Sequence, residues 1–251
     1  MPYGLYVSAE GARAQSQRLG VLANNLANVD TAAFKRDVAL FQARFAEAAE
    51  RGLAAPGDGS INDLGGGIEI CETKTDFSNG PLKGTGQDLD FAIKGDGFFV
   101  VQKDGKNLLT RAGNFQLEPS GALVTQDGDA VLDDGGAPVV IDPDNGPWVL
   151  SPDGCINQGG DALPLALVRP RSLGDLVKTG ENRFKSLAPT TPLEPGERQV
   201  LQGFREGSGV RPTLEMMELI ETSRAFEANT NMIRHQDQAM GTLVSRVLKD
   251  S

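Results

Sequence analysis

The chain has 251 residues, of which 39% are hydrophobic, 23% charged and only 6% aromatic. This length and composition fit one or two folded domains and argue against a chain that is disordered throughout. The formal net charge of −10 disfavours binding to nucleic acid or to anionic membrane surfaces. Two distant cysteines, Cys71 and Cys155, and a single histidine, His235, leave few metal ligands, so neither a metal nor another cofactor is expected.

The 31 glycines and 14 prolines are unevenly distributed, because nearly all of them lie between Gly52 and Gly209. The two ends are poor in both residues, which predicts long terminal helices. No apolar run is long enough to span a membrane, and the first residues lack the basic segment and the apolar core of a secretory signal peptide. We therefore expect neither membrane insertion nor a cleaved signal peptide.

The N-terminal segment carries a seven-residue repeat, which is typical of a coiled-coil seam. Two rows of residues recur at this spacing: Leu5, Ala12, Leu19 and Leu26, and Ser8, Gln15, Leu22 and Val29. After a turn rich in asparagine comes a shorter amphipathic stretch, Val38, Phe41, Phe45 and Ala48, which ends at Gly52. These patterns predict a helical segment over residues 1–51.

The C-terminal segment predicts one very long helix. Pro212 suits its first turn. No proline and only one glycine, Gly241, lie between Pro212 and Lys249, so a length of about 37 residues and roughly 55 Å is expected. Its seam, flanked by Met216 and Val244, consists of Leu219, Phe226, Ile233, Met240 and Val247. A stripe this narrow needs a second helix, so the two ends are expected to pair as a coiled coil. A closed intramolecular hairpin and assembly with neighbouring copies both fit the pattern.

Residues 52–207 are expected to form a β-rich antiparallel domain, because short alternating segments are separated by Asp-Gly and Asn-Gly turns. The expected inward residues are Ile68, Ile70, Leu89, Phe91, Ile93, Phe99, Val101, Phe115, Leu117, Leu123, Val139 and Ile141. Residues 1–45 carry a net charge of +2 and residues 208–251 one of −1, which leaves −11 for the residues between them. The fold class is thus α+β, with a β domain inserted between helical segments 1–51 and 208–251.

Catalytic motifs are not found in the sequence, so no catalytic, cofactor-binding or metal-binding residue is predicted and the chain is not expected to be an enzyme. Gly95-Asp96-Gly97 fits a hairpin turn better than a dinucleotide loop. The segment from Asp142 to Gly146 resembles a calcium loop, but Pro152 stands where that loop needs an acidic ligand. His235 is expected to be a solvated or interface residue.

Three ordered groups of motifs remain, near the start, the centre and the end of the chain. They are Asn24–Thr31 with Phe34-Lys35, then Leu89–Val101 with Thr110–Phe115 and Gly121–Thr125, and finally Met217–Asn229. In this order they resemble the signatures of the bacterial flagellar rod and hook proteins, and together they span nearly the whole chain.

The resemblance implies a structural subunit of the flagellar basal-body rod. In that family the terminal helices pair as a coiled coil and pack with those of neighbouring subunits into the inner tube of a helical filament, which transmits torque from motor to hook. The implied partners are other rod and hook subunits and the flagellar export apparatus. The implied location is the rod where it crosses the periplasm, reached without a cleaved signal peptide.

Within this family, the length and the single β domain favour a rod protein over the hook subunit. The proximal rod is favoured over the distal rod because the arginine-rich junction of many distal rod proteins is replaced by Phe34–Ala49 and the run Leu53–Gly67. Three residues depart from the pattern: Ala33 replaces a common glycine, Phe226 a tyrosine and Asn231 a lysine. Alanine is poorly suited to a position that needs positive φ, so Ala33 places the expected turn in question.

The resemblance and the two seams together suggest an assembly interface formed by Leu19, Leu22, Asn24, Asn25, Leu26, Asn28, Val29, Leu219, Arg224, Phe226, Asn229, Ile233, Met240 and Val247. Two alternatives come from other classes of protein. One is a β-rich, carbohydrate-active enzyme that uses two of the many carboxylates, and the other is a monomeric adaptor whose ends form a closed helix hairpin.

Overall fold

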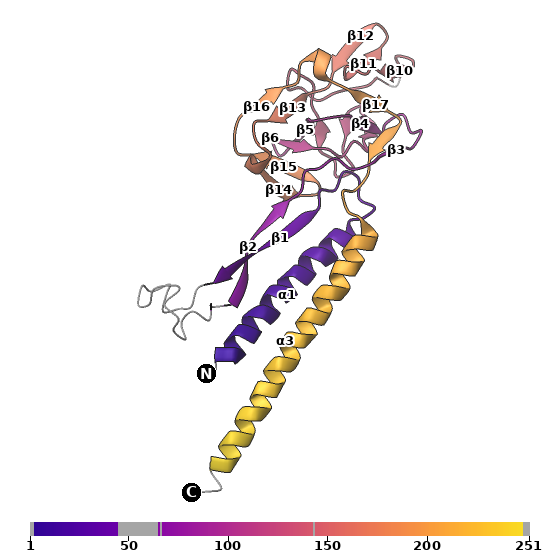
Figure 1. The fold of residues 1–251 in the computed structure, drawn as a ribbon. Coiled ribbons are helices and arrows are strands. Elements are labelled where there is room, and N and C mark those ends of the chain that lie inside the picture. Colours follow the sequence, from indigo (N-terminus) through magenta and orange to yellow (C-terminus); the bar gives the residue numbers. More distant parts are fainter. Residues whose placement is uncertain (1–2, 45–64, 66, 143, 248–251) are drawn as a thin grey trace. The chain divides into compact units, whose positions relative to one another are not determined.

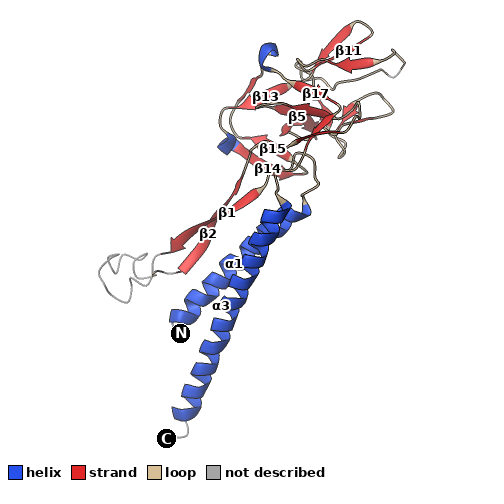
Figure 2. Ribbon diagram, turned by 45° about the vertical axis from the view of Figure 1, so that its right-hand side comes forward, coloured by secondary structure: helices blue, strands red, loops and turns tan. Residues whose placement is uncertain are grey.

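The computed structural model describes residues 3–44, 65, 67–142 and 144–247. Along the chain, one long helix, α1 (Tyr3–Ala27), comes before a series of short antiparallel strands, and a second, α3 (Pro212–Val247), follows them (Figure 1; Figure 2). This confirms the predicted α+β class. The described residues form two compact units. The helix unit comes from residues 1–27, 37–76 and 211–251, and the β unit comes from residues 28–36 and 77–210.

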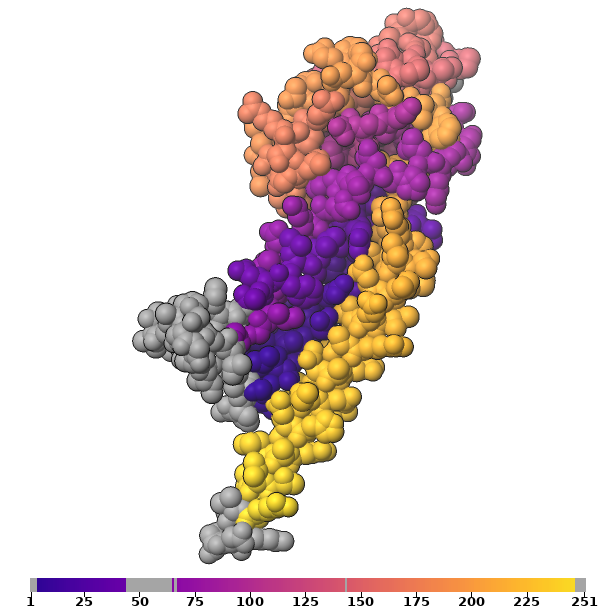
Figure 3. All heavy atoms as spheres, in the orientation of Figure 1, coloured from indigo at the N-terminus to yellow at the C-terminus, as the bar shows by residue number. Residues whose placement is uncertain are grey.

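Helix α3 begins at Pro212, as its sequence predicts, and has 36 residues. Glu215 in its first turn and Arg246 in its last turn both complement the helix dipole. Lys249, the expected end of this helix, lies outside the described residues. In the helix unit, α3 runs beside α1 and continues past the described start of α1 (Figure 3).

The prediction of a helical segment over residues 1–51 is wrong for residues 37–44, which form strand β1 (Asp37–Arg44). This strand pairs antiparallel with β2 (Gly67–Thr75), with a bulge between Leu40 and Phe41. The helical spacing of Val38 and Phe41 is overridden because the ladder with β2 satisfies the backbone of this segment. The expected helical positions Phe45 and Ala48, and Gly52 as the expected end of this stretch, lie outside the described residues.

The β unit is built on a nine-stranded sheet in which β5 is central and pairs with β6, β9 and β13. Along the main path the strand order is β14-β15-β6-β5-β9-β8-β7, and β16 pairs with β13. The strands of this sheet are β5 (Phe98–Lys103), β6 (Lys106–Thr110), β7 (Gln116–Leu117), β8 (Leu123–Val124), β9 (Ala130–Val131), β13 (Leu167–Pro170), β14 (Leu176–Gly180), β15 (Arg183–Ser186) and β16 (Thr190–Pro192).

Smaller antiparallel sheets complete the β unit. β10 (Trp148–Leu150), β11 (Cys155–Gln158) and β12 (Asp161–Pro164) form a three-stranded sheet. β3 (Leu82–Gly84) pairs with β18 (Phe204–Glu206), and β4 (Phe91–Ile93) pairs with β17 (Val200–Gln202). These two pairings join the start and the end of the inserted segment, so the β unit closes on itself.

The core of the β unit lies on both faces of β5. Phe99 and Val101 belong to one buried cluster, whereas the alternate residues Phe98 and Val100 belong to a second. Because successive side chains of a strand point to opposite faces, β5 is buried on both sides. This explains the nearly continuous apolar run in its sequence.

Most of the expected inward residues of the β unit are in the first cluster: Phe91, Ile93, Phe99, Val101, Phe115, Leu123, Val139 and Ile141 are buried, and Leu89 and Leu117 are partly buried against them. The prediction is wrong for Ile68, which lies in β2 of the helix unit and is 37% exposed. A two-stranded hairpin has no second sheet to cover its outer face, so its apolar residues stay partly exposed.

Candidate assembly interface and buried ionic cluster

Helices α1 and α3 contact each other antiparallel, in a register that follows the seven-residue repeat of α1. Four pairs along the two helices define it: Gly4 with Gln236, Gly11 with Asn229, Arg18 with Glu218, and Asn25 with Glu215. Residue numbers therefore increase along α1 in the direction in which they decrease along α3. The pairing of the two terminal segments is present within a single chain.

Glycine allows the two helices to approach closely at two of these positions. A Cβ atom on Gly4 would lie 2.9 Å from Gln236 Nε2, and one on Gly11 would lie 3.2 Å from Asn229 Nδ2. Both distances are short for a carbon contact, so α3 occupies the space that a side chain would need. At Gly20 the same atom would meet nothing within 4 Å, so this glycine faces open space.

Asn25 connects three segments of the helix unit and is fully buried. Its Nδ2 donates to the Asp37 carbonyl oxygen at 2.8 Å, and its Oδ1 accepts from the Asp37 backbone N–H at 2.9 Å. The same Nδ2 lies 3.4 Å from Glu215 Oε2, in the first turn of α3. The amide therefore ties the end of α1 to the start of β1 and to the start of α3.

The row of α3 that flanks the apolar seam on the side of α1 is polar: Glu215, Thr222, Asn229 and Gln236. Glu215 and Thr222 are each 2% exposed, whereas Met216, which the sequence analysis placed beside the seam, is 50% exposed. Among the described residues, the buried Oε1 atoms of Gln15 and Gln236 accept no hydrogen bond. The pair is thus held by a narrow apolar row with a polar row beside it, which is a weak combination for an isolated pair of helices.

The other expected interface residues differ widely in burial. On α1, Leu22 is buried, Leu19 and Leu26 are half-buried and Asn24 is exposed. On α3, Leu219, Phe226, Asn229 and Ile233 are half-buried, whereas Arg224 and Met240 are exposed and the side chain of Val247 lies outside the described residues. The row Leu219, Phe226 and Ile233 runs along α3 at the seven-residue spacing, and its burial decreases beyond Ile233.

Asn28 and Val29 belong to the β unit, in the turn that follows α1. Asn28 accepts hydrogen bonds from Thr31, through its carbonyl from the backbone N–H at 3.3 Å and through Oδ1 from the hydroxyl at 3.1 Å. Ala33, further along, has φ +52° and is 1% exposed. The expected turn therefore forms with alanine in the left-handed region, and Ala33 N–H donates to the Glu206 carbonyl oxygen at 2.9 Å.

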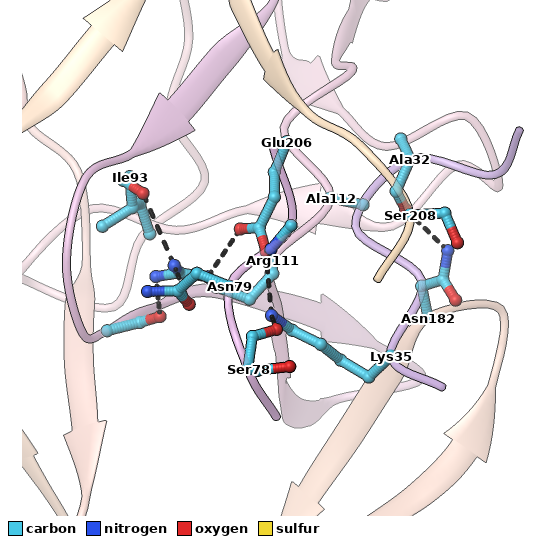
Figure 4. A network of polar contacts seen from close by, with 12 residues as sticks. Ala32, Lys35, Ser78, Asn79, Ile93, Arg111, Ala112, Asn182, Glu206 and Ser208 are labelled. Carbon is cyan, nitrogen blue, oxygen red and sulfur yellow. Dashed lines mark hydrogen bonds and ion pairs between the residues drawn. The ribbon is translucent and has the colours of Figure 1, made fainter. Parts of the chain in front are cut away.

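Lys35, Arg111 and Glu206 form an ionic cluster inside the β unit (Figure 4). Their side chains are only 1%, 2% and 1% exposed, respectively. Lys35 Nζ lies 2.8 Å from Glu206 Oε1, and Arg111 Nε lies 2.9 Å from Glu206 Oε2. One carboxylate thus serves two buried cations.

Backbone groups complete the hydrogen bonding of this cluster. Lys35 Nζ donates to the Ser78 carbonyl oxygen at 2.9 Å, and Gly80 N–H donates to Glu206 Oε1 at 2.9 Å. Arg111 also donates to four oxygen atoms: Gly97 O at 2.7 Å, Gly95 O at 2.8 Å, Asn79 Oδ1 at 2.8 Å and Ile93 O at 3.4 Å. Buried charges are tolerated when all their hydrogen-bonding groups are used, and this cluster comes close to that condition.

Sequence reasoning missed this cluster. Lys35 and Arg111 stand inside the quoted motifs Phe34-Lys35 and Thr110–Phe115, but no role was predicted for either, and Glu206 carried no signal. The one signal for this cluster in the sequence was a charged residue directly beside apolar residues of a family motif. The partners are 171 and 95 positions apart, so one sequence cannot pair them.

The remaining candidates for chemistry lie apart from one another. Within the described residues there is no group of three or more His, Cys, Asp or Glu side chains that could hold a metal ion. None of the described helices has the length and apolar character needed to cross a bilayer. Cys71 and Cys155 are free thiols, and burial together with the neighbouring Asp153 raises the pKa of Cys155.

Three family models match the chain, in the order of its three motif groups. Residues 5–35 match the flagella basal body rod protein model, residues 92–158 match the D1 domain of the flagellar hook protein FlgE/F/G, and residues 201–246 match the C-terminal model of the flagellar basal body rod FlgEFG proteins. The matched segments contain both helices and much of the β unit.

Similar proteins match over nearly their whole length. The flagellar basal-body rod protein FlgF of Caulobacter vibrioides is 35% identical over 99% of both chains, and that of Rhizobium meliloti is 34% identical over 97% of this chain and 98% of its own. The flagellar basal-body rod protein FlgG of Bacillus subtilis is 30% identical over 96% of this chain and 97% of its own. The paired terminal helices, the β unit between them and these full-length matches together place the chain in the family of flagellar basal-body rod proteins, as a structural subunit of the rod.

Proposed function

We propose that this rod subunit transmits torque from motor to hook through its terminal helices, which pack as a coiled coil and assemble with those of neighbouring copies into a helical tube. The single observation that carries the proposal is an apolar face of α3 directed away from α1. Met217 and Ile220 are 54% and 53% exposed. Their spacing, three residues apart, places them on one face together with the exposed Arg224.

The far end of α3 supports the same proposal. Met240, Leu243 and Val244 are 42%, 59% and 54% exposed and lie beyond Gln236, the residue that faces Gly4 near the described start of α1. Apolar residues left uncovered in this number mark a surface that another protein covers. Helices of neighbouring subunits, which carry the same heptad rows, match this surface.

The proposed assembly interface contains the residues that the seams and the family motifs indicate. They are Leu19, Leu22, Asn24, Asn25, Leu26, Asn28, Val29, Leu219, Arg224, Phe226, Asn229, Ile233, Met240 and Val247. Leu22 and Asn25 hold the pair within one chain, whereas the exposed Arg224 and Met240 are available to neighbours. Repeated heterologous contacts of this kind distribute a twisting load over many subunits, without substrate turnover.

We place the subunit in the proximal rod, where it crosses the periplasm, with other rod and hook subunits as neighbours. The chain reaches this site through the flagellar export apparatus. The sequence of the segment after Phe34, which lacks the arginine-rich junction of many distal rod proteins, supports the proximal position over the distal one. Antibody labelling of purified basal bodies, with and without the gene, tests this placement.

The interface is tested by motility in a deletion strain that expresses variants of the chain. Met217→Glu with Ile220→Glu introduces two charges on the exposed face of α3, and we expect loss of swimming with normal amounts of exported protein. Phe226→Ala removes a half-buried ring of the seam and is expected to reduce swimming, with a cost of about 1–2 kcal/mol in helix pairing.

A matched control changes two exposed apolar residues of the β unit, Val149 and Leu187, which are 59% and 68% exposed. Val149→Glu with Leu187→Glu makes the same chemical change within the β unit, and swimming should be retained. Normal motility of the Met217→Glu, Ile220→Glu variant would refute the proposed role of this face.

A further inference from the structure

We propose that a basic pocket in the β unit receives an acidic turn from a second copy of this chain, an inference that rests on the proposed assembly function. The cavity has a volume of about 250 Å³ and lies beside the buried ionic cluster. Lys35 and Arg111 form part of its lining, and Arg169 and Arg171 come from the end of β13 and the residue after it. Asp96 is the one acidic residue among its lining residues.

The charge of this pocket is opposite to that of the protein. Four cationic side chains line it against one carboxylate, whereas the whole chain has a net charge of −10. Behind the lining, the carboxylate of Glu206 is shared by Lys35 and Arg111, so the buried cluster itself has an excess of one positive charge. A fixed positive charge under a concave surface attracts an anionic group.

Two arginines at the rim of the pocket, Arg169 and Arg171, differ in how strongly other residues hold them. Arg169 lies 3.4 Å from Glu197 in an exposed ion pair, which is a weak interaction. Arg171 is exposed and forms neither a hydrogen bond nor an ion pair with any described residue. Its guanidinium is therefore available to bind a carboxylate, and the planar donor group suits a two-point contact.

The walls of the pocket are partly aromatic. Phe77 and Phe98 line it and contact each other edge to face, with ring centroids 6.3 Å apart. The guanidinium of Arg111 lies over the Phe98 ring at 5.8 Å from its centroid. Apolar walls reduce the local water and so strengthen an ionic contact. The site thus suits a short acidic side chain with its adjoining backbone.

Charge complementarity identifies a second copy as the occupant. Two copies with the same large negative charge repel each other, so a contact between their β units is favoured where a basic surface on one meets an acidic surface on the other. Such a contact uses two different surfaces and is heterologous, as a rod that grows along its axis requires.

The turn that contains Asp127 is the acidic surface that best fits this role. Asp127 is exposed, and its carboxylate has no hydrogen bond or ion pair among the described residues. Gly128, at φ +84°, closes the turn with a hydrogen bond from its N–H to the Thr125 carbonyl oxygen. The other described Asp-Gly turns are less suitable. Asp134 is paired with Arg198, and Asp153 accepts a hydrogen bond from the Cys155 N–H. Asp96 lines the pocket itself, and Asp104 stands between two lysines.

The test measures association of two preparations of the full-length chain, one labelled and one not, by microscale thermophoresis at about 50 mM and about 500 mM salt. Arg169→Glu with Arg171→Glu should weaken association by at least about tenfold at low salt, and high salt should weaken the wild-type association in the same direction. Lys106→Glu with Lys185→Glu changes the net charge equally at exposed positions away from the pocket, and should leave association unchanged.

A charge exchange tests the proposed occupant. Asp127→Lys should lose association with the wild-type pocket and regain it with the Arg169→Glu, Arg171→Glu chain. Failure of this recovery overturns the assignment of Asp127. Equal weakening by the two double variants, or no association at either salt concentration, overturns the copy-to-copy contact.

Inorganic phosphate serves as a probe for small free anions. Binding of phosphate that depends on Arg169 and Arg171, in the absence of any association between copies, would show a small-anion site and would overturn the proposal. The proposed function of the helices is tested independently of the pocket. If the Arg169→Glu, Arg171→Glu chain associates normally while Met217→Glu with Ile220→Glu abolishes motility, the pocket proposal fails and the helix proposal is retained.

Discussion

Lys35 Nζ lies 2.8 Å from Glu206 Oε1, although the two residues are 171 positions apart. Arg111, whose Nε contacts the other oxygen of the same carboxylate, completes the cluster. Each of the three residues comes from a different one of the three segments that match rod and hook family models. The cluster thus joins the start, the centre and the end of the family pattern at one point inside the β unit.

Removing the charge of Glu206 is expected to destabilise the β unit strongly. Glu206→Gln leaves Lys35 and Arg111 buried without a counterion, and breaking a buried pair in this way costs about 3–5 kcal/mol. Urea unfolding followed by tryptophan fluorescence measures the loss through Trp148 in β10. A Glu206→Gln chain within about 1 kcal/mol of wild type would show that the cluster carries little stability.

The control for this variant is an ion pair on the surface of the same unit. Lys103 and Glu181 lie 3.2 Å apart with side chains 39% and 49% exposed. Exposed pairs contribute at most about 1 kcal/mol, so Lys103→Met should shift the unfolding midpoint only slightly. The contrast between the two variants isolates the effect of burial from that of charge.

A second prediction concerns Gly113, in the motif that follows Arg111. A Cβ atom on Gly113 would overlap the carbonyl oxygen of Phe91, and the Phe91 N–H donates to the Gly113 carbonyl at 2.8 Å. Because the obstacle is backbone and is fixed by this hydrogen bond, it cannot move aside. Gly113→Ala should destabilise the β unit by about 3 kcal/mol or more.

Gly196 provides the comparison for Gly113. It is exposed, and a Cβ atom there would meet nothing within 4 Å. Gly196→Ala should therefore leave the free energy of unfolding the same within about 1 kcal/mol, or raise it by restricting the unfolded chain. Similar effects of the two substitutions, measured by chemical denaturation, would contradict the assigned role of Gly113.

The sequence was sufficient to predict the parts of the molecule whose residues repeat locally. The seven-residue rows and Pro212 predicted both long helices, and the alternation around Phe91, Phe99 and Phe115 predicted one core of the β unit. These signals depend on neighbours a few positions apart, and helix and strand periods are directly visible at that range.

Features that depend on distant partners could not be predicted. Strand β1 exists because β2 pairs with it, and the spacing of Val38 and Phe41 alone suggested a helix. The polar row of α3 that includes Thr222 faces α1, and glycines on α1 allow a close approach at Asn229 and Gln236 of this row. The sequence of α3 alone could not show on which side of Leu219 the partner helix lies.

A third prediction concerns Ala33, which is held at φ +52°. Alanine in the left-handed region costs about 1–2 kcal/mol, whereas glycine there loses more backbone entropy and one buried methyl group. These effects nearly cancel, so Ala33→Gly should change the free energy of unfolding by no more than about 1 kcal/mol.

Ala33→Val is the informative partner of that variant. A β-branched residue tolerates positive φ poorly, and the site is only 1% exposed, so two more methyl groups must be placed inside packed surroundings. We expect a loss of about 2–4 kcal/mol, measured by thermal or urea unfolding. A stable Ala33→Val chain would indicate that the turn adopts another backbone conformation in solution.

The last prediction separates two glycines of the same helix. A Cβ atom on Gly11 would lie 3.2 Å from the Asn229 side chain of α3, so a leucine there must displace that side chain, whereas Gly20 faces open space. Gly20→Leu replaces a poor helix former with a good one and should stabilise α1 by about 0.5–1 kcal/mol. Gly11→Leu gains the same helix propensity but forces α3 away, so a net loss of about 1–3 kcal/mol in helix pairing is expected. Thermal melts followed by far-ultraviolet circular dichroism compare the two variants. Equal melting temperatures would mean that α1 and α3 do not approach closely at Gly11, whereas a lower one for Gly11→Leu alone places the contact at the glycine row.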